Sequence, residues 1–394
     1  MTTRPFTFSA PVPVAFGANR VDQLGDDVTA LVGSAAPVLV VTDPGVARAG
    51  LAERARAALA HKGHVPLLCA DVRSDPLAAQ IDAAAALARE AGARCVVGIG
   101  GGSALDVAKL AATLAPSATP AMHVALGANP LPRDGLPRIC IPTTAGTGSE
   151  VTRTSVFTTA DRRKVWGWGD ENRATLAILD PTLTVGLPAR LTAATGIDAM
   201  VHAIEGATVR RANPFADAPC LQAIRILASG ALLRAVQHPD DLDARGQVLM
   251  AACLAGIGFD VTGVGVAHAM GHAIGAIAGV HHGRAVGLCL NAALAWNAPS
   301  NPARYAAVAR ALGAPCDGLD DKAAAALAAP AYERILRAVG VEISLAGDGL
   351  TPADAERVAA LTLAEENLPM CKSNSREVTP ESARELAGRL LAAA

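Results

Sequence analysis

The sequence predicts an α/β N-terminal domain built on a mostly parallel sheet, followed by an all-helical C-terminal domain. Three observations support this fold class: short β-branched runs alternate with helical stretches in the first half, a glycine cluster follows one such run, and strand-like runs become scarce after residue 181. Strands that alternate with helices imply right-handed crossovers and parallel pairing. Pro181, Gly186 and Pro188 interrupt the chain, so we expect domains at 1–184 and 185–394.

The individual elements follow from periodicity and turn residues. Short apolar runs bounded by turn residues predict strands at 38–41, 64–69, 95–99 and 138–142, and a last strand-like run lies at 176–181. Ala- and Leu-rich periodicity predicts helices at 51–60, 76–91 and 104–114. Helical periodicity then continues to the C-terminus, except for a polar tail at 367–380 that we expect to be irregular, and a last helix should start near Glu381.

The composition restricts the class of function. Among 394 residues, 51% are hydrophobic, and 34 basic against 36 acidic residues give a formal net charge of −2. No basic block is present, so we expect no nucleic-acid partner. Eight widely spaced cysteines without a CxxC pair indicate reduced thiols and a cytoplasmic protein. The first residues lack the basic and apolar regions of a secretory signal.

One apolar stretch, 254–280, is long enough to resemble a membrane span. Asp260, His268 and His272 lie inside it, and ionisable side chains are costly in hydrocarbon. We therefore interpret the stretch as a buried helix pair and expect no membrane partner.

A glycine loop, Gly-Ile-Gly-Gly-Gly-Ser at 98–103, lies between an expected strand and an expected helix. Glycines let the backbone approach an anion closely, and a helix N-terminus adds partial positive charge. A tight strand-to-helix turn is the alternative, but consecutive glycines carry an entropic cost that such a turn does not require. The loop therefore indicates a phosphate site.

Asp43 ends the first clear strand and precedes the glycine loop. In the standard dinucleotide fingerprint the acidic residue follows the glycines instead, so the arrangement is Rossmann-like but non-standard. An Asp at this place can bind a ribose 2′-hydroxyl and repel a 2′-phosphate, which favours NAD over NADP. A turn or cap residue is the alternative interpretation.

A second loop, Pro-Thr-Thr-Ala-Gly-Thr-Gly-Ser-Glu at 142–150, follows the strand expected at 138–142. Its hydroxyls and glycines lie where open α/β sheets bind ligands, at the carboxyl edge of the sheet. A hydroxyl turn would explain one or two of these residues but not the whole run.

Acidic and histidine side chains with helical spacing form a candidate metal site. Asp198 and His202 share one helix face, and His268 and His272 repeat this spacing. His281 and His282 follow in a loop. A buried core histidine is the alternative for any one of them. A carboxylate with imidazoles and no thiolate suits Fe²⁺ or Zn²⁺, but spacing leaves open which of His272 and His281 stays unligated.

Taken together, the glycine loop, PTTAGTGSEVT at 142–152, GIDAMVHAIEG at 196–206 and the HAMGH…HHG segment at 268–283 resemble the iron-containing, group III alcohol dehydrogenases. ILDPTLTVGLP at 178–188, ANPFADA at 212–218 and NSREVTPE at 374–381 extend the resemblance over nearly the whole chain. It implies a dehydroquinate synthase-like architecture and hydride transfer between NAD(H) and a small alcohol, aldehyde or ketone. We also expect a homo-oligomer, because edge strands and helical faces of this kind often pair.

The resemblance also implies roles for individual residues. The metal ligands match Asp198, His202, His268 and His282, with Fe²⁺ favoured and Zn²⁺ as the second choice, and His272 matches a residue beside the nicotinamide that relays a proton. The cofactor contacts match Gly100, Gly101, Gly102 and Ser103 at the pyrophosphate, Thr143, Thr144 and Thr147 in the second loop, Asp43 at the adenosine ribose, and Lys164 near the nicotinamide ribose.

Some positions depart from the family pattern. His281 stands where Pro is frequent, Leu-Asn-Ala-Ala at 290–293 replaces a frequent Leu-Pro-His, and Ser375 also replaces Pro. Two alternative reactions stay open: a maleylacetate-type reductase, which commonly lacks the full ligand set, and a dehydroquinate synthase-like lyase that uses NAD and a metal. A non-catalytic metal-binding protein is the third alternative, and it would not need two cofactor loops.

Overall fold

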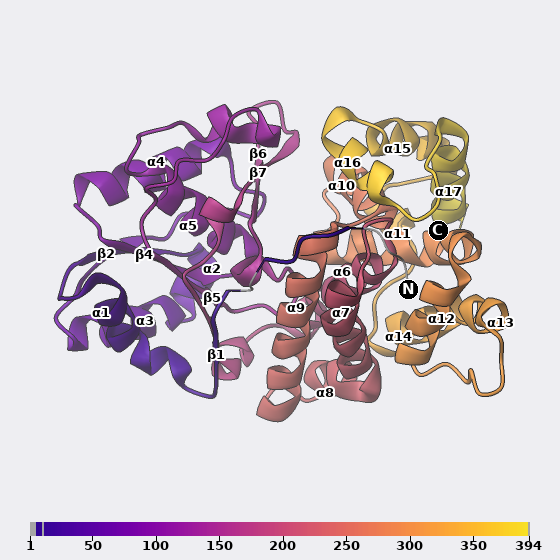
Figure 1. The fold of residues 1–394 in the computed structure, drawn as a ribbon, viewed down its shortest axis with the longest axis horizontal. Coiled ribbons are helices and arrows are strands. Elements are labelled where there is room, and N and C mark those ends of the chain that lie inside the picture. Colours follow the sequence, from indigo (N-terminus) through magenta and orange to yellow (C-terminus); the bar gives the residue numbers. More distant parts are fainter. Residues whose placement is uncertain (1–4, 10–11, 393–394) are drawn as a thin grey trace. The chain divides into compact units, whose positions relative to one another are not determined.

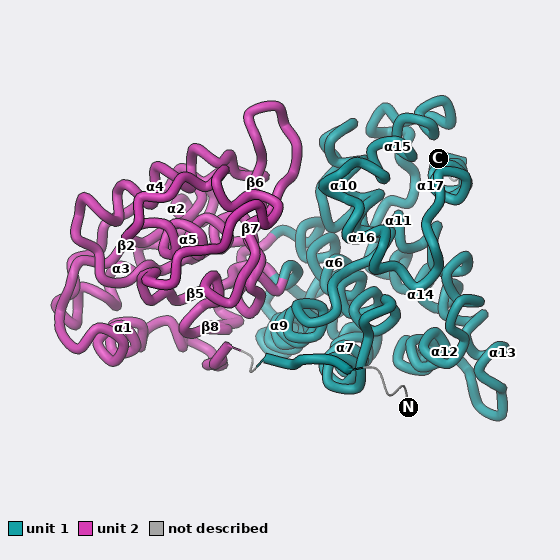
Figure 2. Tube along the Cα trace, turned by 45° about the horizontal axis from the view of Figure 1, so that its top comes forward, with its two compact units in different colours: residues 1–10, 145–147, 188–394 teal, residues 11–144, 148–187 magenta. Residues whose placement is uncertain are grey.

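The protein is described by a computed structural model that covers residues 5–9 and 12–392 (Figure 1). Residues 1–4 and 10–11, part of the segment examined for a secretory signal, lie outside the described residues. The chain divides into two compact units (Figure 2). Unit 2 comprises residues 11–144 and 148–187, and unit 1 comprises 188–394 with the short segments 1–10 and 145–147. The domain boundary between 184 and 185 stays a prediction.

Unit 2 contains the parallel sheet that the sequence predicts. Its strands lie in the order β1-β8-β5-β4-β2-β3, and every neighbouring pair is parallel. The strands are β1 (Val14–Phe16), β2 (Pro37–Val41), β3 (Val65–Cys69), β4 (Cys95–Gly100), β5 (Arg138–Pro142) and β8 (Leu176–Leu179). The central strands β4 and β5 are buried along their whole length, as continuous apolar runs in a covered parallel sheet should be. The predicted fold class is confirmed.

Helices cover both faces of this sheet (Figure 1). They are α1 (Leu24–Val32), α2 (Pro44–Arg48), α3 (Leu51–His61), α4 (Ala78–Glu90) and α5 (Gly102–Leu114). Side chains alternate along β2, so that Val38 and Val40 pack with α1 and α3, whereas Leu39 and Val41 pack with α4 and α5. The helices on both faces hold the sheet in place, and with it the carboxyl edge at which β4 is followed by α5.

An antiparallel hairpin in unit 2 was not predicted. It consists of β6 (Thr154–Thr158) and β7 (Lys164–Trp168), which pair with each other in a separate sheet. Short strand β1 was not predicted either. β1 has no buried residue, and β6 and β7 combine buried positions with partly buried or exposed ones over five residues each, a weaker signal than the apolar runs of the central strands.

Within the described residues, unit 1 consists of helices joined by loops and contains no strand. Its helices are α6 (Ala189–Thr208), α7 (Pro214–Ile226), α8 (Leu232–Gln237), α9 (Leu242–Thr262), α10 (Val266–Ala278), α11 (His282–Asn297), α12 (Pro302–Ala311), α13 (Asp321–Ala326), α14 (Ala328–Ala338), α15 (Ala355–Thr362), α16 (Leu368–Ser373) and α17 (Pro380–Ala392). The irregular tail expected at 367–380 was wrong in part, because α16 occupies its first half. Pro369 lies in the first turn of α16, where proline is tolerated.

Glycines let the central helices of unit 1 approach closely. A Cβ atom on Gly283 of α11 would lie 2.2 Å from the carbonyl oxygen of Ala194 on α6, and one on Gly271 of α10 would lie 2.5 Å from Cγ1 of Val286 on α11. Real Cβ contacts are essentially never so short, so a side chain at either position would force its neighbours to move. These glycines therefore allow α11 to pack closely against both α6 and α10.

The stretch 254–280 forms the end of α9 and the whole of α10, and residues 266–274 of α10 are buried except for His272. Two helical stretches, Pro214–Gln237 and Leu242–Thr262, are long and apolar enough to cross a membrane by length and composition alone. The core helix of a soluble protein passes the same test. In the second stretch 67% of the most apolar segment is buried inside the protein, and in the first stretch 39% is buried.

Candidate metal centre

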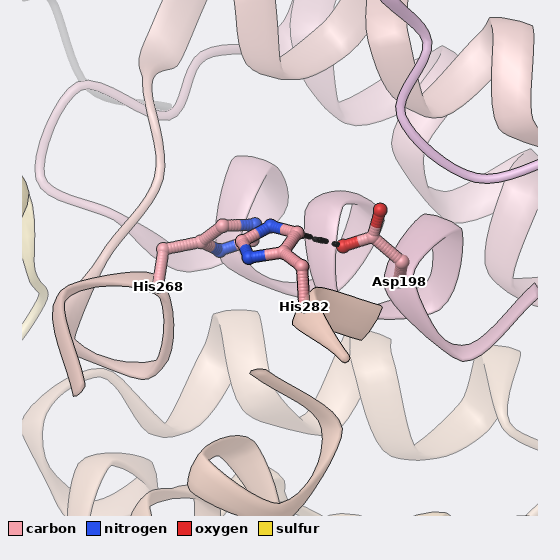
Figure 3. Close-up of side chains that lie close together, drawn as sticks. All are labelled: Asp198, His268 and His282. Carbon is pink, nitrogen blue, oxygen red and sulfur yellow. Dashed lines mark ion pairs between the residues drawn. The ribbon is translucent and has the colours of Figure 1, made fainter. Parts of the chain in front are cut away.

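The candidate metal ligands lie on three helices of unit 1. Asp198 and His202 lie one turn apart on α6, His268 lies in the first turn of α10, and His282 is the first residue of α11. Figure 3 shows the imidazoles of His268 and His282 and the carboxylate of Asp198 close together. The close packing of α6, α10 and α11 thus brings together residues that are far apart in the sequence.

The Oδ1 atom of Asp198 lies near a ring nitrogen of each of the three histidines. It is 3.7 Å from Nε2 of His282, 3.8 Å from Nδ1 of His202 and 3.9 Å from Nε2 of His268. These distances are too long for hydrogen bonds. They suit ligand atoms that surround one cation at about 2.0–2.2 Å each.

Asp198, His268 and His282 offer ligand atoms that all lie within 4.8 Å of one another. His202 adjoins this group through the same oxygen of Asp198, and its ring stacks on that of His268 with centroids 4.5 Å apart. The ring of His202 also stacks on Phe259 of α9, at 4.2 Å. The structure therefore brings the four ligand candidates that the family resemblance implies into one cluster, with His202 at its side.

The buried atoms of this cluster fit a divalent cation. Within residues 5–9 and 12–392, Oδ1 of Asp198, Nδ1 of His202 and Nε2 of His268 are buried and have no hydrogen-bond partner. Unpartnered buried polar atoms are costly, and a cation would satisfy all three at once. Burial lowers the pKa of His202 to about 4, so its imidazole stays neutral at physiological pH and keeps the lone pair that a metal requires.

His272 lies beside the cluster rather than within it. Its ring centroid is 5.4 Å from that of His282, and its Nδ1 atom is 3.1 Å from Oδ1 of Asn367. The side-chain amide of Asn367 donates to the carbonyl oxygen of Leu361 at 2.8 Å. Its oxygen is thereby turned towards His272, and it accepts a hydrogen bond from Nδ1. Asn367 was not singled out from the sequence, because only the tertiary fold brings α10 and this segment together.

The glycine loop forms the junction of β4 and α5 in unit 2. Gly101 is the N-cap residue of α5, and Gly102 and Ser103 begin that helix, so their amide groups belong to a helix N-terminus. A Cβ atom on Gly100 would lie 2.7 Å from Cβ of Ala104. Gly100 is therefore required by the fold, whereas at Gly101 a Cβ atom would meet only Thr144, at 3.5 Å.

Asp43 both caps a helix and borders the glycine loop. Its Oδ1 atom accepts hydrogen bonds from the amides of Gly45 at 2.8 Å and Val46 at 3.0 Å, at the start of α2. The cap that the sequence offered as an alternative is therefore present. The other oxygen, Oδ2, lies 3.2 Å from the position of a Cβ atom on Gly100, which places it next to the loop.

The remaining cofactor candidates occupy different surroundings. The amide of Thr143 donates to the carbonyl oxygen of Gly100 at 2.9 Å, and Thr144 lies against Gly101. Thr147 belongs to the short segment that groups with unit 1. Lys164 begins β7, and its ammonium lies 2.9 Å from the carboxylate of Asp75. The structure thus joins Thr143 and Thr144 to the glycine loop and gives Lys164 an acidic partner.

The buried ion pair between Lys109 and Asp106 contacts the end of the second loop. Nζ of Lys109 on α5 donates to the carbonyl oxygens of Ser149 at 2.8 Å and Thr154 at 2.6 Å. It lies 3.4 Å from Asp106, which accepts from the amide of Val156 at 2.9 Å. Lysine is rare in this chain, and that scarcity is the sequence signal that could have drawn attention to Lys109.

Comparisons with known proteins agree in both halves of the chain. The family model described as iron-containing alcohol dehydrogenase matches residues 11–181, and the model described as the C-terminal region of the Fe-containing alcohol dehydrogenase family matches residues 192–388. Long-chain-alcohol dehydrogenase 1 of Geobacillus thermodenitrificans is 35% identical over 92% of this chain and 93% of its own length. The 1,3-propanediol dehydrogenase of Citrobacter freundii is 33% identical over 93% of this chain and 95% of its own.

Solved structures show the same likeness in three dimensions. The crystal structure of a 1,3-propanediol oxidoreductase superposes with a TM-score of 0.91 at 31% identity, covering 98% of this chain and all of the other. An alcohol dehydrogenase from Oenococcus oeni superposes with a TM-score of 0.89 at 32% identity, covering 97% of this chain and 99% of the other.

Proposed function

Because the chain belongs to the family of iron-containing alcohol dehydrogenases, we propose that it uses one Fe²⁺ ion to transfer a hydride between NAD(H) and a small alcohol or its carbonyl product. The resemblance noted in the sequence is thereby confirmed, and the chain is an alcohol dehydrogenase or carbonyl reductase with a soluble enzyme fold. The choice of Fe²⁺ over Zn²⁺, the choice of NAD over NADP, and the residue roles are our proposals.

The convergence of three imidazoles on Oδ1 of Asp198 carries this proposal. The cation would be held by Asp198, His202, His268 and His282. The facing nitrogen atoms of the three histidines lie 3.7–3.9 Å from Oδ1 of Asp198. Among the described residues, three of these four bury a polar atom that has no hydrogen-bond partner. Three neutral imidazoles and one carboxylate leave a dication with a net charge of about +1. When bound, such a cation supplies Lewis-acid polarisation of an alcohol or carbonyl oxygen.

His272 is our proposed proton carrier. Asn367 accepts a hydrogen bond from its Nδ1 atom, which leaves Nε2 as the basic nitrogen of the neutral ring. His272 is partly exposed, so a proton taken up at Nε2 can pass to solvent. This placement beside His282 suits a group that accepts the proton of an alcohol during oxidation and returns it during reduction.

In unit 2, the glycine loop is proposed to bind the pyrophosphate of the cofactor. Gly100, Gly101, Gly102 and Ser103 form the β4–α5 junction, with Thr143 and Thr144 alongside and Thr147 following them in the same loop. Asp43 would accept a hydrogen bond from the adenosine ribose through Oδ2. Lys164 is proposed to contact the nicotinamide ribose, for which it would exchange or share its partner Asp75.

The two alternative reactions fit the chain less well. A maleylacetate-type reductase commonly lacks the full ligand set, which this chain retains. A dehydroquinate synthase-like lyase must hold a phosphate-bearing substrate, but the helical unit contains only Lys322 and Lys372 as lysines. Relatives at similar identity are named alcohol dehydrogenase, 1,3-propanediol dehydrogenase and sulfoacetaldehyde reductase, which supports alcohol or carbonyl chemistry.

We also propose that the protein is cytoplasmic and forms a homo-oligomer.

The direct test is metal-dependent NADH formation. Metal-free protein is loaded with Fe²⁺ or Zn²⁺ in separate samples and offered primary alcohols and diols of increasing chain length, with NAD or NADP. We expect turnover with Fe²⁺ and NAD, and none in the Asp198→Ala variant. Absence of turnover with every metal and cofactor, or full activity of metal-free protein, would contradict the proposal.

A further inference from the structure

A second carboxylate, Glu205, lies behind the metal cluster on the same helix as Asp198. Its Oε2 atom is 2.6 Å from Nδ1 of His268, and its Oε1 atom accepts a hydrogen bond from the amide of Ala267 at 2.8 Å. Only 3% of its surface is exposed. One buried carboxylate on α6 therefore holds both the backbone and a side chain at the start of α10.

We propose that Glu205 is a positioning residue that fixes His268 in the tautomer and orientation needed for metal binding, an inference that rests on the proposed function. A carboxylate can only accept from Nδ1, so the proton of the neutral ring must stay on that nitrogen. Nε2 then carries the lone pair, and it is this atom that lies 3.9 Å from Oδ1 of Asp198. A carboxylate behind a ligating histidine also raises the basicity of the ligand.

The charge around Glu205 points to the same role. Among the ion pairs of the described residues, Glu205 takes part only in the one with His268, and no lysine or arginine pairs with it. A buried carboxylate without a cationic partner is costly. A dication held through Asp198 and the imidazoles would be offset by the two carboxylates together, so Glu205 completes the charge balance of the site.

The surroundings leave Glu205 little freedom to turn away. A Cβ atom on Gly265, just before α10, would lie 2.9 Å from Oε1 of Glu205 and 2.8 Å from Oδ1 of Asn374. Asn374 is itself held by Asn297, to which its side-chain amide donates at 2.8 Å. Gly265 thus leaves room beside Oε1 of Glu205 that the Cβ atom of any other residue would fill.

The competing interpretation is that Glu205 only caps α10 through the amide of Ala267. Glu205→Gln separates the two roles. The amide of Ala267 always donates, so the glutamine oxygen must face it and the cap is kept. The glutamine NH₂ group then faces Nδ1 of His268, which has to become the acceptor, and the ring proton moves to Nε2, the nitrogen required by the metal.

The test measures Fe²⁺ and Zn²⁺ affinity by chelator competition in the wild type, in Glu205→Gln and in the control Asp217→Asn. Asp217 is a carboxylate of the same unit that pairs with Arg304 at 2.8 Å, so its variant removes a charge without touching the cluster. We expect Glu205→Gln to weaken metal affinity about 10- to 100-fold, with the melting temperature of the metal-free protein close to that of wild type, and Asp217→Asn to bind metal as wild type does.

A second measurement keeps the inference testable if the variant does not fold. Nitrogen NMR of the metal-free wild type should show His268 protonated at Nδ1. Metal affinity in Glu205→Gln within about twofold of wild type, or a wild-type His268 that is protonated at Nε2 and not at Nδ1, would overturn the role of Glu205 while leaving the proposed function standing. A wild type that binds neither cation would overturn the proposed function, and this inference with it.

Discussion

Nε2 of His282 lies 3.7 Å from Oδ1 of Asp198, which joins the first residue of α11 to the middle of α6. The adjacent His281 is exposed, whereas His282 exposes only 29% of its side chain. His281 and His282 are adjacent in the sequence but differ in exposure, and His282 is the one that faces Asp198.

Replacing His282 with Ala should abolish stoichiometric metal binding. Loss of a ligand removes more affinity than loss of a supporting hydrogen bond, which costs about 10- to 100-fold. Metal content after dialysis, measured by atomic emission, checks this. The matched variant His281→Ala should retain metal, and equal metal content in the two variants would contradict the assignment of His282.

Replacing His272 with Ala should lower kcat about 100-fold or more, the range typical of a lost acid–base group, while metal content and NAD affinity remain near those of wild type. The pH dependence of kcat is the decisive readout, because a proton carrier controls its shape. Asn367→Ala should give a smaller loss, since it frees the ring that Asn367 orients. An unchanged pH profile in His272→Ala would assign the proton step elsewhere.

The sequence was sufficient for those elements whose apolar pattern is continuous. β4 and β5 are buried at every position, so their runs of β-branched residues stand out. The hairpin β6–β7 was not predicted because half of its side chains are exposed or partly exposed. Helix α16 was not predicted because its six residues follow a polar segment and contain Pro369, and so short a helix depends on tertiary packing.

For the candidate site, spacing within one helix was informative and long-range pairing was not. The separation of Asp198 and His202 alone places them on one face of α6. Glu205 and Asn367 were not identified because their partners, His268 and His272, lie on another element, and no local pattern encodes that contact. The choice of His282 over His281 came from the family resemblance, since adjacent residues carry no periodicity.

Replacing Asp43 with Asn should relax the preference for NAD. Asparagine caps helices about as well as aspartate, so the bonds to Gly45 and Val46 should persist and stability should change little. The lost charge would no longer repel a 2′-phosphate. We expect the ratio of kcat/KM for NADP to that for NAD to rise about tenfold, equivalent to about 1.4 kcal/mol. A ratio that does not move would restrict Asp43 to its capping role.

Substitution at adjacent glycines should separate folding from cofactor binding. A Cβ atom at Gly100 would collide with Ala104, whereas one at Gly101 meets only ordinary contacts. Gly101→Ala should therefore keep the melting temperature of wild type but weaken NAD binding at least about tenfold, because the methyl group occupies the approach to the helix N-terminus. Gly100→Ala should lose stability and NAD binding together. Calorimetry of unfolding and of NAD binding checks both, and unimpaired NAD binding in Gly101→Ala would place the pyrophosphate elsewhere.

Glu150 should make the protein less stable as pH rises. Its side chain is buried at the end of the second loop, and burial raises its pKa from 4.5 to about 7. The folded protein therefore holds a proton that the unfolded chain releases between these values, so stability is highest below about pH 4.5 for this group and falls as pH rises through about 7. The loss is on the order of 3 kcal/mol by the usual conversion of pKa shifts.

Glu150→Gln should remove this dependence, because glutamine has nearly the same shape as the protonated carboxyl group and does not titrate. We expect wild type and variant to melt at similar temperatures near pH 5, and the variant to melt several degrees higher at pH 8. Both proteins are unfolded by heat in the presence of a chelator, so that metal binding does not contribute to the difference. A constant difference between them from pH 5 to pH 8 would show that Glu150 is ionised in the folded protein throughout this range.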